Sequence, residues 1–116
     1  MRKESEITYL IDENVMMSDE DINNFNSCKV LNSLDFFDKG TPDEKITNLA
    51  KDNGWFIVTK DIRMALRSLI DNVPVIFISD HFKSTHLLTA ISHGSEQFPE
   101  MFDYIYKRFG YKDDHE

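Results

Sequence analysis

Three runs of apolar, β-favouring residues stand out along the chain, at residues 7–11, 55–59 and 73–78. Each run is nearly continuous, whereas a strand with one face in water alternates between apolar and polar positions. Continuous runs of this length are typical of strands that are covered on both faces in a parallel sheet. A weaker run at residues 29–31 predicts a fourth strand at the other side of that sheet.

The segments between these predicted strands carry helix signals. Ser18, followed by three acidic residues, predicts a short helix with an N-terminal cap. A longer helix is predicted from Thr41 as the N-cap, Pro42 at the first helical position and Glu44 as the capping-box partner. Gly54 suits the left-handed residue that ends such a helix.

Apolar side chains recur at helical spacing in three segments of the second half of the chain, at residues 62–70, 84–93 and 98–109. Strands that alternate with helices predict an α/β fold, because parallel strands need crossover connections. We therefore expect a three-layer α/β/α sandwich with a mostly parallel sheet of four or five strands. Residues 84–110 form an extra, helical C-terminal portion in this prediction.

Composition narrows the class of protein. With 116 residues, the chain has the size of a single domain over residues 1–116 and buries roughly two thirds of its unfolded surface. Its one cysteine, Cys28, cannot form an internal disulfide, which favours a reducing cytoplasm. No run approaches the roughly 18 apolar residues of a membrane helix, and the apolar run near the N-terminus is too short for a signal peptide. We expect a cytoplasmic protein without a membrane partner.

Acidic residues follow the predicted strands. Asp12 ends the first strand, Asp61 follows the strand at residues 55–59, and Asp80 follows the last strand. The carboxyl ends of parallel strands lie along one edge of a sheet, where such folds bind ligands. Asp43 or Glu44, at the start of a helix, approaches the same edge from the side. The sequence therefore predicts a cluster of carboxylates there.

Such a cluster is unfavourable unless it is protonated or neutralised, and a hard divalent cation is the usual solution. Mg²⁺ held by carboxylates serves phosphodiester hydrolysis, and it also supplies the positive potential that a chain of net charge -8 lacks for binding nucleic acid. Structural interpretations stay open beside this one. Asp12 could accept backbone hydrogen bonds in the following turn, Asp61 could cap the next helix, and Glu44 could serve only the capping box.

Three basic residues, Lys60, Arg63 and Arg67, flank Asp61 or follow it at helical spacing. They predict a small positive rim that could contact RNA at the same edge of the sheet. A solvated helix face with ion pairs between residues four apart explains them equally well.

Three segments resemble a known family. Residues 9–15, residues 41–46 with the helix that ends at Gly54, and residues 57–61 are similar to the signature segments of small PIN-like domains. These are compact relatives of the PIN ribonucleases of toxin–antitoxin pairs and RNA processing. Order and spacing match over about residues 7–80.

The resemblance implies an endoribonuclease that uses Mg²⁺ or Mn²⁺ and cleaves single-stranded RNA through a metal-activated water. It assigns the catalytic and metal-binding acids to Asp12, Asp43 and Asp61, with Glu44 and Asp80 as further metal ligands. It also assigns supporting polar roles to Asn14 and Thr59. Arg63 stands where the family often has another acid, and the segment from residue 84 onward has no counterpart in the family.

Two other interpretations remain. The chain could be a catalytically silent PIN-like domain that dimerises or binds an antitoxin-like protein through the aromatic residues of its C-terminal helices, which are Phe98, Phe102, Tyr106 and Phe109. It could also be a phospho-receiver domain, which gathers acids after parallel strands but needs a lysine after the last strand.

Overall fold

A parallel sheet lies at the centre of the molecule. The computed structural model describes residues 7–78, 85–86 and 99–109 of the chain. Four strands run parallel, and the short fifth pairs antiparallel with the fourth, in the spatial order β2-β1-β3-β4-β5. The strands are β1 (Thr8–Ile11), β2 (Lys29–Asn32), β3 (Phe56–Thr59), β4 (Val75–Ile78) and β5 (Thr85–His86). The prediction of a mostly parallel sheet in an α/β fold is confirmed.

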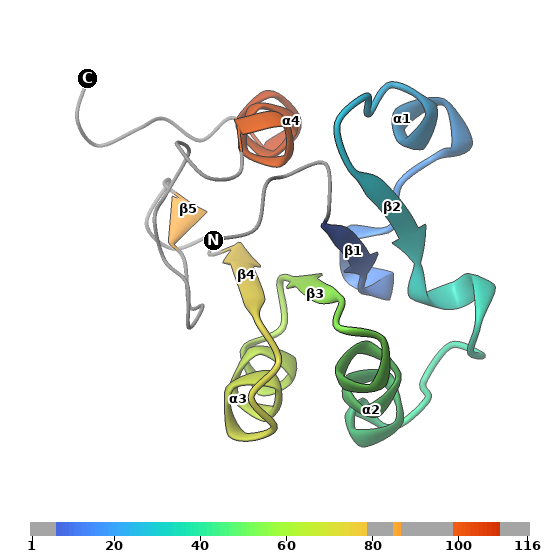
Figure 1. Ribbon diagram of the computed structural model, residues 1–116, viewed down its shortest axis with the longest axis vertical. Helices are drawn as coiled ribbons and strands as arrows, with labels where there is room; N and C mark the ends of the chain where they lie inside the picture. The colour runs from blue at the N-terminus through green and yellow to red at the C-terminus, as the bar shows by residue number, and fades with distance from the viewer. Residues whose placement is uncertain (1–6, 79–84, 87–98, 110–116) are drawn as a thin grey trace.

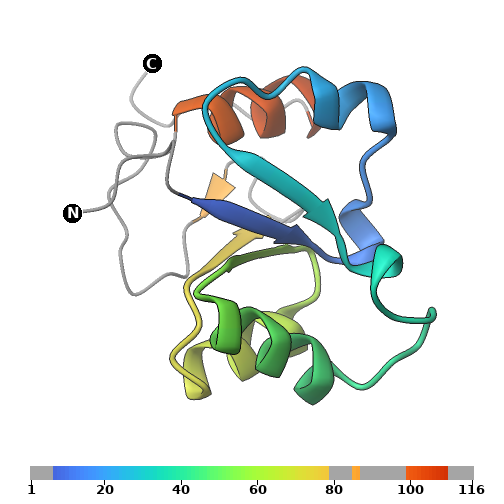
Figure 2. The same ribbon diagram turned by 45° about the vertical axis from the view of Figure 1, so that its right-hand side comes forward.

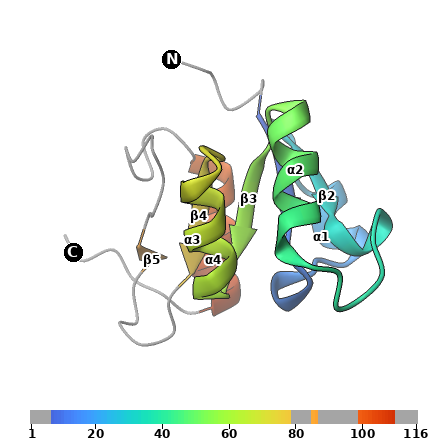
Figure 3. The ribbon, with the colours of Figure 1, turned by 90° about the horizontal axis from the view of Figure 1, so that it is seen from below.

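Helices cover both faces of this sheet, as a three-layer arrangement requires (Figures 1 and 2). On one face lie α1 (Asp19–Asn23) and α4 (Pro99–Phe109), and on the other lie α2 (Asp43–Asn53) and α3 (Ile62–Ile70). Figure 3, a view from below, shows α2 and α3 side by side in front of the sheet. No helix in the described part of the chain has the length and apolar character needed to cross a membrane.

The alternation of side chains along the strands divides the core into two clusters. Tyr9 and Ile11 of β1 point to the α1/α4 face, where α4 adds Met101, Phe102 and Ile105. Leu10 points to the α2/α3 face. Successive strand residues face opposite sides, so this alternation sends the next residue, Asp12, to the α2/α3 face.

Helix ends agree with the sequence signals at two points and differ at a third. The Ser18 hydroxyl accepts a hydrogen bond from Asp21 N at 3.1 Å, and Gly54 adopts a left-handed φ of 69°, as predicted. The prediction of a capping box at the start of α2 is wrong, because the N-cap is Pro42, which has no side chain able to cap the helix. The Thr41 hydroxyl instead donates to the carbonyl of Asp38 at 2.7 Å.

Helix α3 buries fewer apolar residues than its pattern suggests. Met64, Ala65 and Ser68 are buried, whereas a row of large apolar side chains is exposed on its outer side. The exposed fractions are 46% for Ile62, 50% for Leu66, 36% for Leu69 and 73% for Ile70. The apolar pattern of this helix therefore extends beyond the side that packs on the sheet.

The C-terminal portion corrects two predictions. Thr85 and His86 form a strand, where the sequence predicted a helix over residues 84–93; the rest of that segment lies outside the described residues. Phe102, proposed as part of an interaction surface, is 2% exposed and packs in the core. Phe98 and the side chains of Tyr106 and Phe109 lie outside the described residues. Phe102 therefore stabilises the monomer and is not available to a partner.

Candidate functional site

The strand order places a ligand site between β1 and β3. The chain leaves β1 toward β2 on one side and later returns across β1 to β3, so the direction of the connections reverses between these two neighbours. In open α/β sheets, ligands bind beyond the carboxyl ends of the strands at such a switch point. Asp12 directly follows β1, and Asp61 follows β3 with one residue between.

A cleft of about 70 Å³ lies at this edge and is lined by Asp12, Asp43 and Asp61 together. One water molecule needs roughly 10–15 Å³ of such space, so the cleft has room for several. The three acids come from three different elements, the ends of two strands and the start of α2. The structure thus brings together the three residues that the sequence singled out.

Asp12 is held firmly at the floor of this region, with 5% of its surface exposed. Its Oδ2 accepts a hydrogen bond from the Thr59 hydroxyl at 2.7 Å, and its Oδ1 accepts one from Glu13 N at 2.9 Å. Burial raises the pKa of Asp12 above its ordinary value. The two hydrogen bonds oppose this rise, whereas the charges of Asp43 and Glu13 add to it.

Thr59 and Asn14 connect the acids to the backbone of the loop after β3. Thr59 is fully buried, and its hydroxyl both donates to Asp12 and accepts a hydrogen bond from Asp61 N at 3.0 Å. Asn14 Oδ1 accepts a hydrogen bond from Lys60 N at 3.1 Å. These contacts fix the loop that carries Asp61 relative to Asp12.

Asp61 caps a helix and also lines the cleft. Its Oδ1 accepts a hydrogen bond from Arg63 N at 2.9 Å, which makes it the N-cap of α3. The same residue lines the cleft, where it lies close enough to Asp43 for their charges to interact.

Asp43 is the first residue of α2 and reaches the cleft from the opposite wall. Burial is the largest cause that raises the pKa of Asp43, and the nearby carboxylate of Asp61 raises it further. The charges of Arg63 and Arg67 lower the pKa of Asp43 but do not cancel the rise. Two acids with raised pKa values in one cleft indicate a local excess of negative charge that a cation would relieve.

The donor set suits a hard cation that keeps much of its water. Carboxylate oxygens are the ligands that Mg²⁺ prefers, and Mg²⁺ commonly takes one or two of them and fills its shell with water and phosphate oxygens. Within residues 7–78, 85–86 and 99–109, no three His, Cys, Asp or Glu side chains lie close enough to hold one ion together. The described side chains therefore fit a water-rich cation better than one bound directly by three carboxylates.

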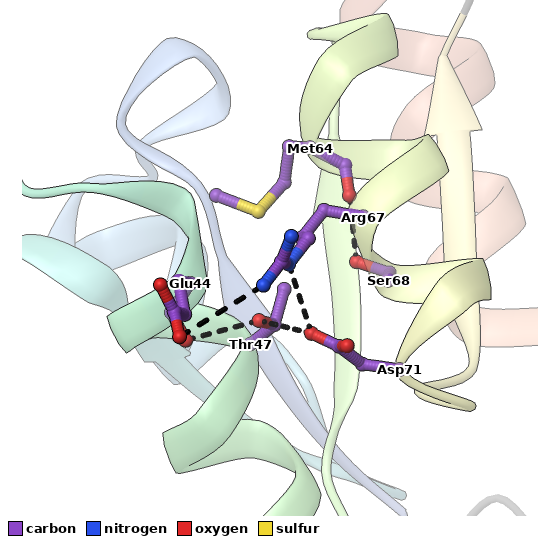
Figure 4. A network of polar contacts seen from close by, with 6 residues as sticks. All are labelled: Glu44, Thr47, Met64, Arg67, Ser68 and Asp71. Carbon is purple, nitrogen blue, oxygen red and sulfur yellow. Dashed lines mark hydrogen bonds and ion pairs between the residues drawn. The ribbon is translucent and has the colours of Figure 1, made fainter.

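Glu44 does not line the cleft and belongs to a network between α2 and α3 (Figure 4). Its Oε1 lies 3.9 Å from a guanidinium nitrogen of Arg67. Arg67 Nε donates to Asp71 Oδ2 at 3.2 Å, and the Thr47 hydroxyl donates to the same oxygen at 2.9 Å. Glu44 thus contributes an exposed ion pair between α2 and α3.

The predicted basic rim is only partly placed at the site. Lys60, Arg63 and Arg67 are not among the residues that line the cleft, although Arg63 and Arg67 lie near enough to lower the pKa of Asp43. Arg67 is engaged by the helix network. Asp80 lies outside the described residues.

Four polar residues that line the cleft were not predicted as site residues: Glu13, Ser33, Asp38 and Thr41. Glu13 begins a short 3-10 helix, η2 (Glu13–Val15), which turns it toward the cleft. Ser33 follows β2 and begins a second one, η3 (Ser33–Asp35). Because β2 is also parallel, the signal for Ser33 was its place after a strand end, which the search for acids overlooked.

Comparisons of the chain with protein-family models, with curated proteins and with solved structures find no match. The support for a function comes from the cleft itself and from the sequence segments that form it. An acidic cleft at a switch point, with room for water and with two carboxyls of raised pKa, can bind a hydrated divalent cation and a phosphate group beside it.

Proposed function

We propose that this chain is a PIN-like endoribonuclease that cleaves single-stranded RNA with the help of Mg²⁺ or Mn²⁺. The observation that carries the proposal is the meeting of Asp12, Asp43 and Asp61, from three elements, in one cleft at the β1/β3 switch point. The sequence resemblance assigns these same three residues to the catalytic site. With a net charge of -8, the chain needs cations at this cleft before an RNA backbone can approach.

The residues of the chain have separable roles in this proposal. Asp12 and Asp61, from the ends of neighbouring strands, hold the cation together with water, and Asp43 faces them from α2. A bound Mg²⁺ or Mn²⁺ activates a water molecule and stabilises negative charge on the scissile phosphate. Thr59 orients Asp12 and favours its ionised form, since its hydroxyl donates to Asp12 Oδ2.

The test is cleavage of a mixed-sequence, single-stranded RNA by the purified chain with Mg²⁺ or Mn²⁺. We expect cutting that EDTA abolishes and that Asp12→Asn reduces at least about a hundredfold, more than the loss usual for groups that only support a metal ligand. Asp52→Asn is the matched control, because Asp52 is an exposed acid of α2 away from the cleft. This control should cut like the wild type.

The stability of Asp12→Asn distinguishes a functional acid from a structural one. Removing one of several crowded carboxylates relieves repulsion, so we expect a thermal midpoint equal to or above that of the wild type. A variant that loses both its fold and its activity would assign Asp12 to structure. Metal-independent cutting that persists in Asp12→Asn would point to a contaminating nuclease and against this proposal.

A further inference from the structure

Ser33 is a buried polar residue of the cleft, and its side chain has no hydrogen-bond partner among the described residues. It lines the cleft and has 2% of its surface exposed. Its backbone carbonyl accepts hydrogen bonds from Phe36 N at 3.0 Å and Phe37 N at 2.9 Å. Within residues 7–78, 85–86 and 99–109, its hydroxyl forms no hydrogen bond. Most buried polar groups in folded proteins are paired, so an unpaired one at a ligand cleft calls for an explanation.

The position of Ser33 is fixed by its neighbour. Asn32 Oδ1 accepts a hydrogen bond from Met17 N at 3.1 Å, and Asn32 Nδ2 donates to Met17 O at 2.8 Å. Both polar atoms of this buried amide are used to tie the end of β2 to the segment after η2. The hydroxyl of Ser33 is thus presented to the cleft by a well-anchored turn, as a binding group should be.

The chemistry of the cleft indicates which ligand atom Ser33 serves. The acids are acceptors when ionised and cannot donate to a phosphate oxygen. Of the two hydroxyls that line the cleft, that of Thr41 donates to the carbonyl of Asp38. The hydroxyl of Ser33 remains as a buried donor for an anionic ligand, and it adds no charge that would compete with a cation.

We propose that Ser33 is a substrate-binding residue whose hydroxyl donates a hydrogen bond to a non-bridging phosphate oxygen of RNA held in the cleft. This inference rests on the proposed nuclease function and extends it to a residue outside the acidic set. The hydrogen bond forms only when the phosphate is present, so substrate binding satisfies a hydroxyl that has no such bond in the free protein.

The test compares Ser33→Ala with Ser68→Ala. Ser68 is also fully buried, but its hydroxyl donates to Met64 O at 2.8 Å within α3, away from the cleft (Figure 4). We expect Ser33→Ala to lower kcat/KM for single-stranded RNA about ten- to a hundredfold, the loss typical of a hydrogen bond to a charged group. Its thermal midpoint should equal or exceed that of the wild type, because no protein partner loses a bond. Ser68→Ala should keep the wild-type kcat/KM.

A second readout does not depend on cleavage. Inorganic phosphate, added with Mg²⁺, should raise the thermal midpoint of the wild type and of Ser68→Ala by binding the folded state. The rise should be smaller in Ser33→Ala. If the wild type cuts RNA and Ser33→Ala matches it in kcat/KM and in the phosphate response, the role of Ser33 is refuted and the nuclease stands.

Two further outcomes count against the proposal. A midpoint of Ser33→Ala well below that of the wild type would make the hydroxyl a structural group. If the wild type does not cut RNA with either metal, the nuclease function fails, and the role of Ser33 on RNA fails with it.

Discussion

The two faces of the sheet use acidic residues in opposite ways. On the α1/α4 face, the carboxylate of Glu100 accepts hydrogen bonds from Asn26 N at 2.8 Å and Ser27 N at 2.9 Å. Burial by itself raises the pKa of Glu100, but the hydrogen bonds from Ser27 and Asn26 outweigh it and the pKa is lowered. On the α2/α3 face, burial and neighbouring acids raise the pKa values of Asp12 and Asp43.

Other polar contacts on the α1/α4 face repeat the pattern of Glu100. The Tyr104 hydroxyl donates to Asp21 Oδ2 at 3.1 Å, and Arg108 donates to the carbonyl of Val15 at 2.9 Å. Each contact ties α4 to a segment more than eighty residues earlier in the chain. These described polar groups are paired within the protein, so they hold α4 against the earlier segments of the chain.

The contrast suggests how to separate structural from functional acids. An acid whose charge is matched by backbone donors stabilises the folded state when ionised. An acid whose charge is opposed by burial and by other acids destabilises it and gains from a cation or a ligand. The predictions below test whether the α2/α3 face and the α1/α4 face differ in this way.

Among the variants that compare the two faces, the largest effect is expected on the cleft face, at Thr59. Thr59→Val keeps the shape of the side chain but removes the hydroxyl that donates to Asp12 and accepts from Asp61 N. We expect RNA cleavage to fall about ten- to a hundredfold, as is usual when a group that orients a metal ligand is lost. The acidic limb of the pH–rate profile should also move to higher pH, since a bond that lowers the pKa of Asp12 is gone.

Thr47→Val is the control for this substitution. Thr47 is as buried as Thr59, and its hydroxyl also donates to an acid, Asp71, but in the network between α2 and α3 (Figure 4). Both variants should lose some stability, whereas only Thr59→Val should lose activity and shift the pH profile. Equal losses of activity in both variants would mean that activity depends on any buried hydrogen bond of this face and not on those at the cleft in particular.

Much of this arrangement follows from the sequence, and the reasons are local. The four parallel strands were predicted because continuous apolar runs need cover on both faces, and Asp12 and Asp61 were predicted because they follow such runs. The alternation of side chains along a strand then decides the face, which explains why Thr59 and Asp12 meet. The strands and the face of each side chain depend on residues close together in the chain, whereas the contact of Thr59 with Asp12 also needs the pairing of β1 with β3.

The features that the sequence did not reveal depend on distant parts of the chain. The periodicity of α3 places Leu66 and Ile70 on the apolar pattern of the helix, whereas both are exposed, because packing against strands elsewhere in the chain decides which side is covered. The burial of Ser33 depends on the pairing of Asn32 with Met17, fifteen residues away. The capping signal at Thr41 is an exception that failed for a local reason, because the Thr41 hydroxyl donates to the carbonyl of Asp38.

A smaller effect is expected on the α1/α4 face, where Glu100→Ala should lower the free energy of unfolding by about 1 kcal/mol. The value is modest because Glu100 is partly exposed and water can replace some of its bonds. Denaturant unfolding measures it, with Asp103→Ala as the control. Asp103 forms only an exposed ion pair with Lys107, so its loss should cost less. Kinetic constants for RNA that change with Glu100→Ala would contradict the separation of the two faces.

The smallest effect is a pH dependence of opposite sign on the two faces, measured as thermal midpoints in metal-free buffer. The folded-state pKa of Glu100 is lowered, so its stabilisation is present above the unfolded value of 4.5 and is lost as the pH falls through the folded pKa. The folded-state pKa of Asp12 is raised, so its ionisation costs stability as the pH rises from 3.8 through the folded pKa. At neutral pH, the thermal midpoint of Glu100→Ala should therefore lie below that of the wild type, and the thermal midpoint of Asp12→Asn should equal or exceed it. Both differences in thermal midpoint from the wild type should shrink on acidification. Added Mg²⁺ should reduce only the difference for Asp12→Asn, because a cation replaces the repulsion at Asp12 with attraction.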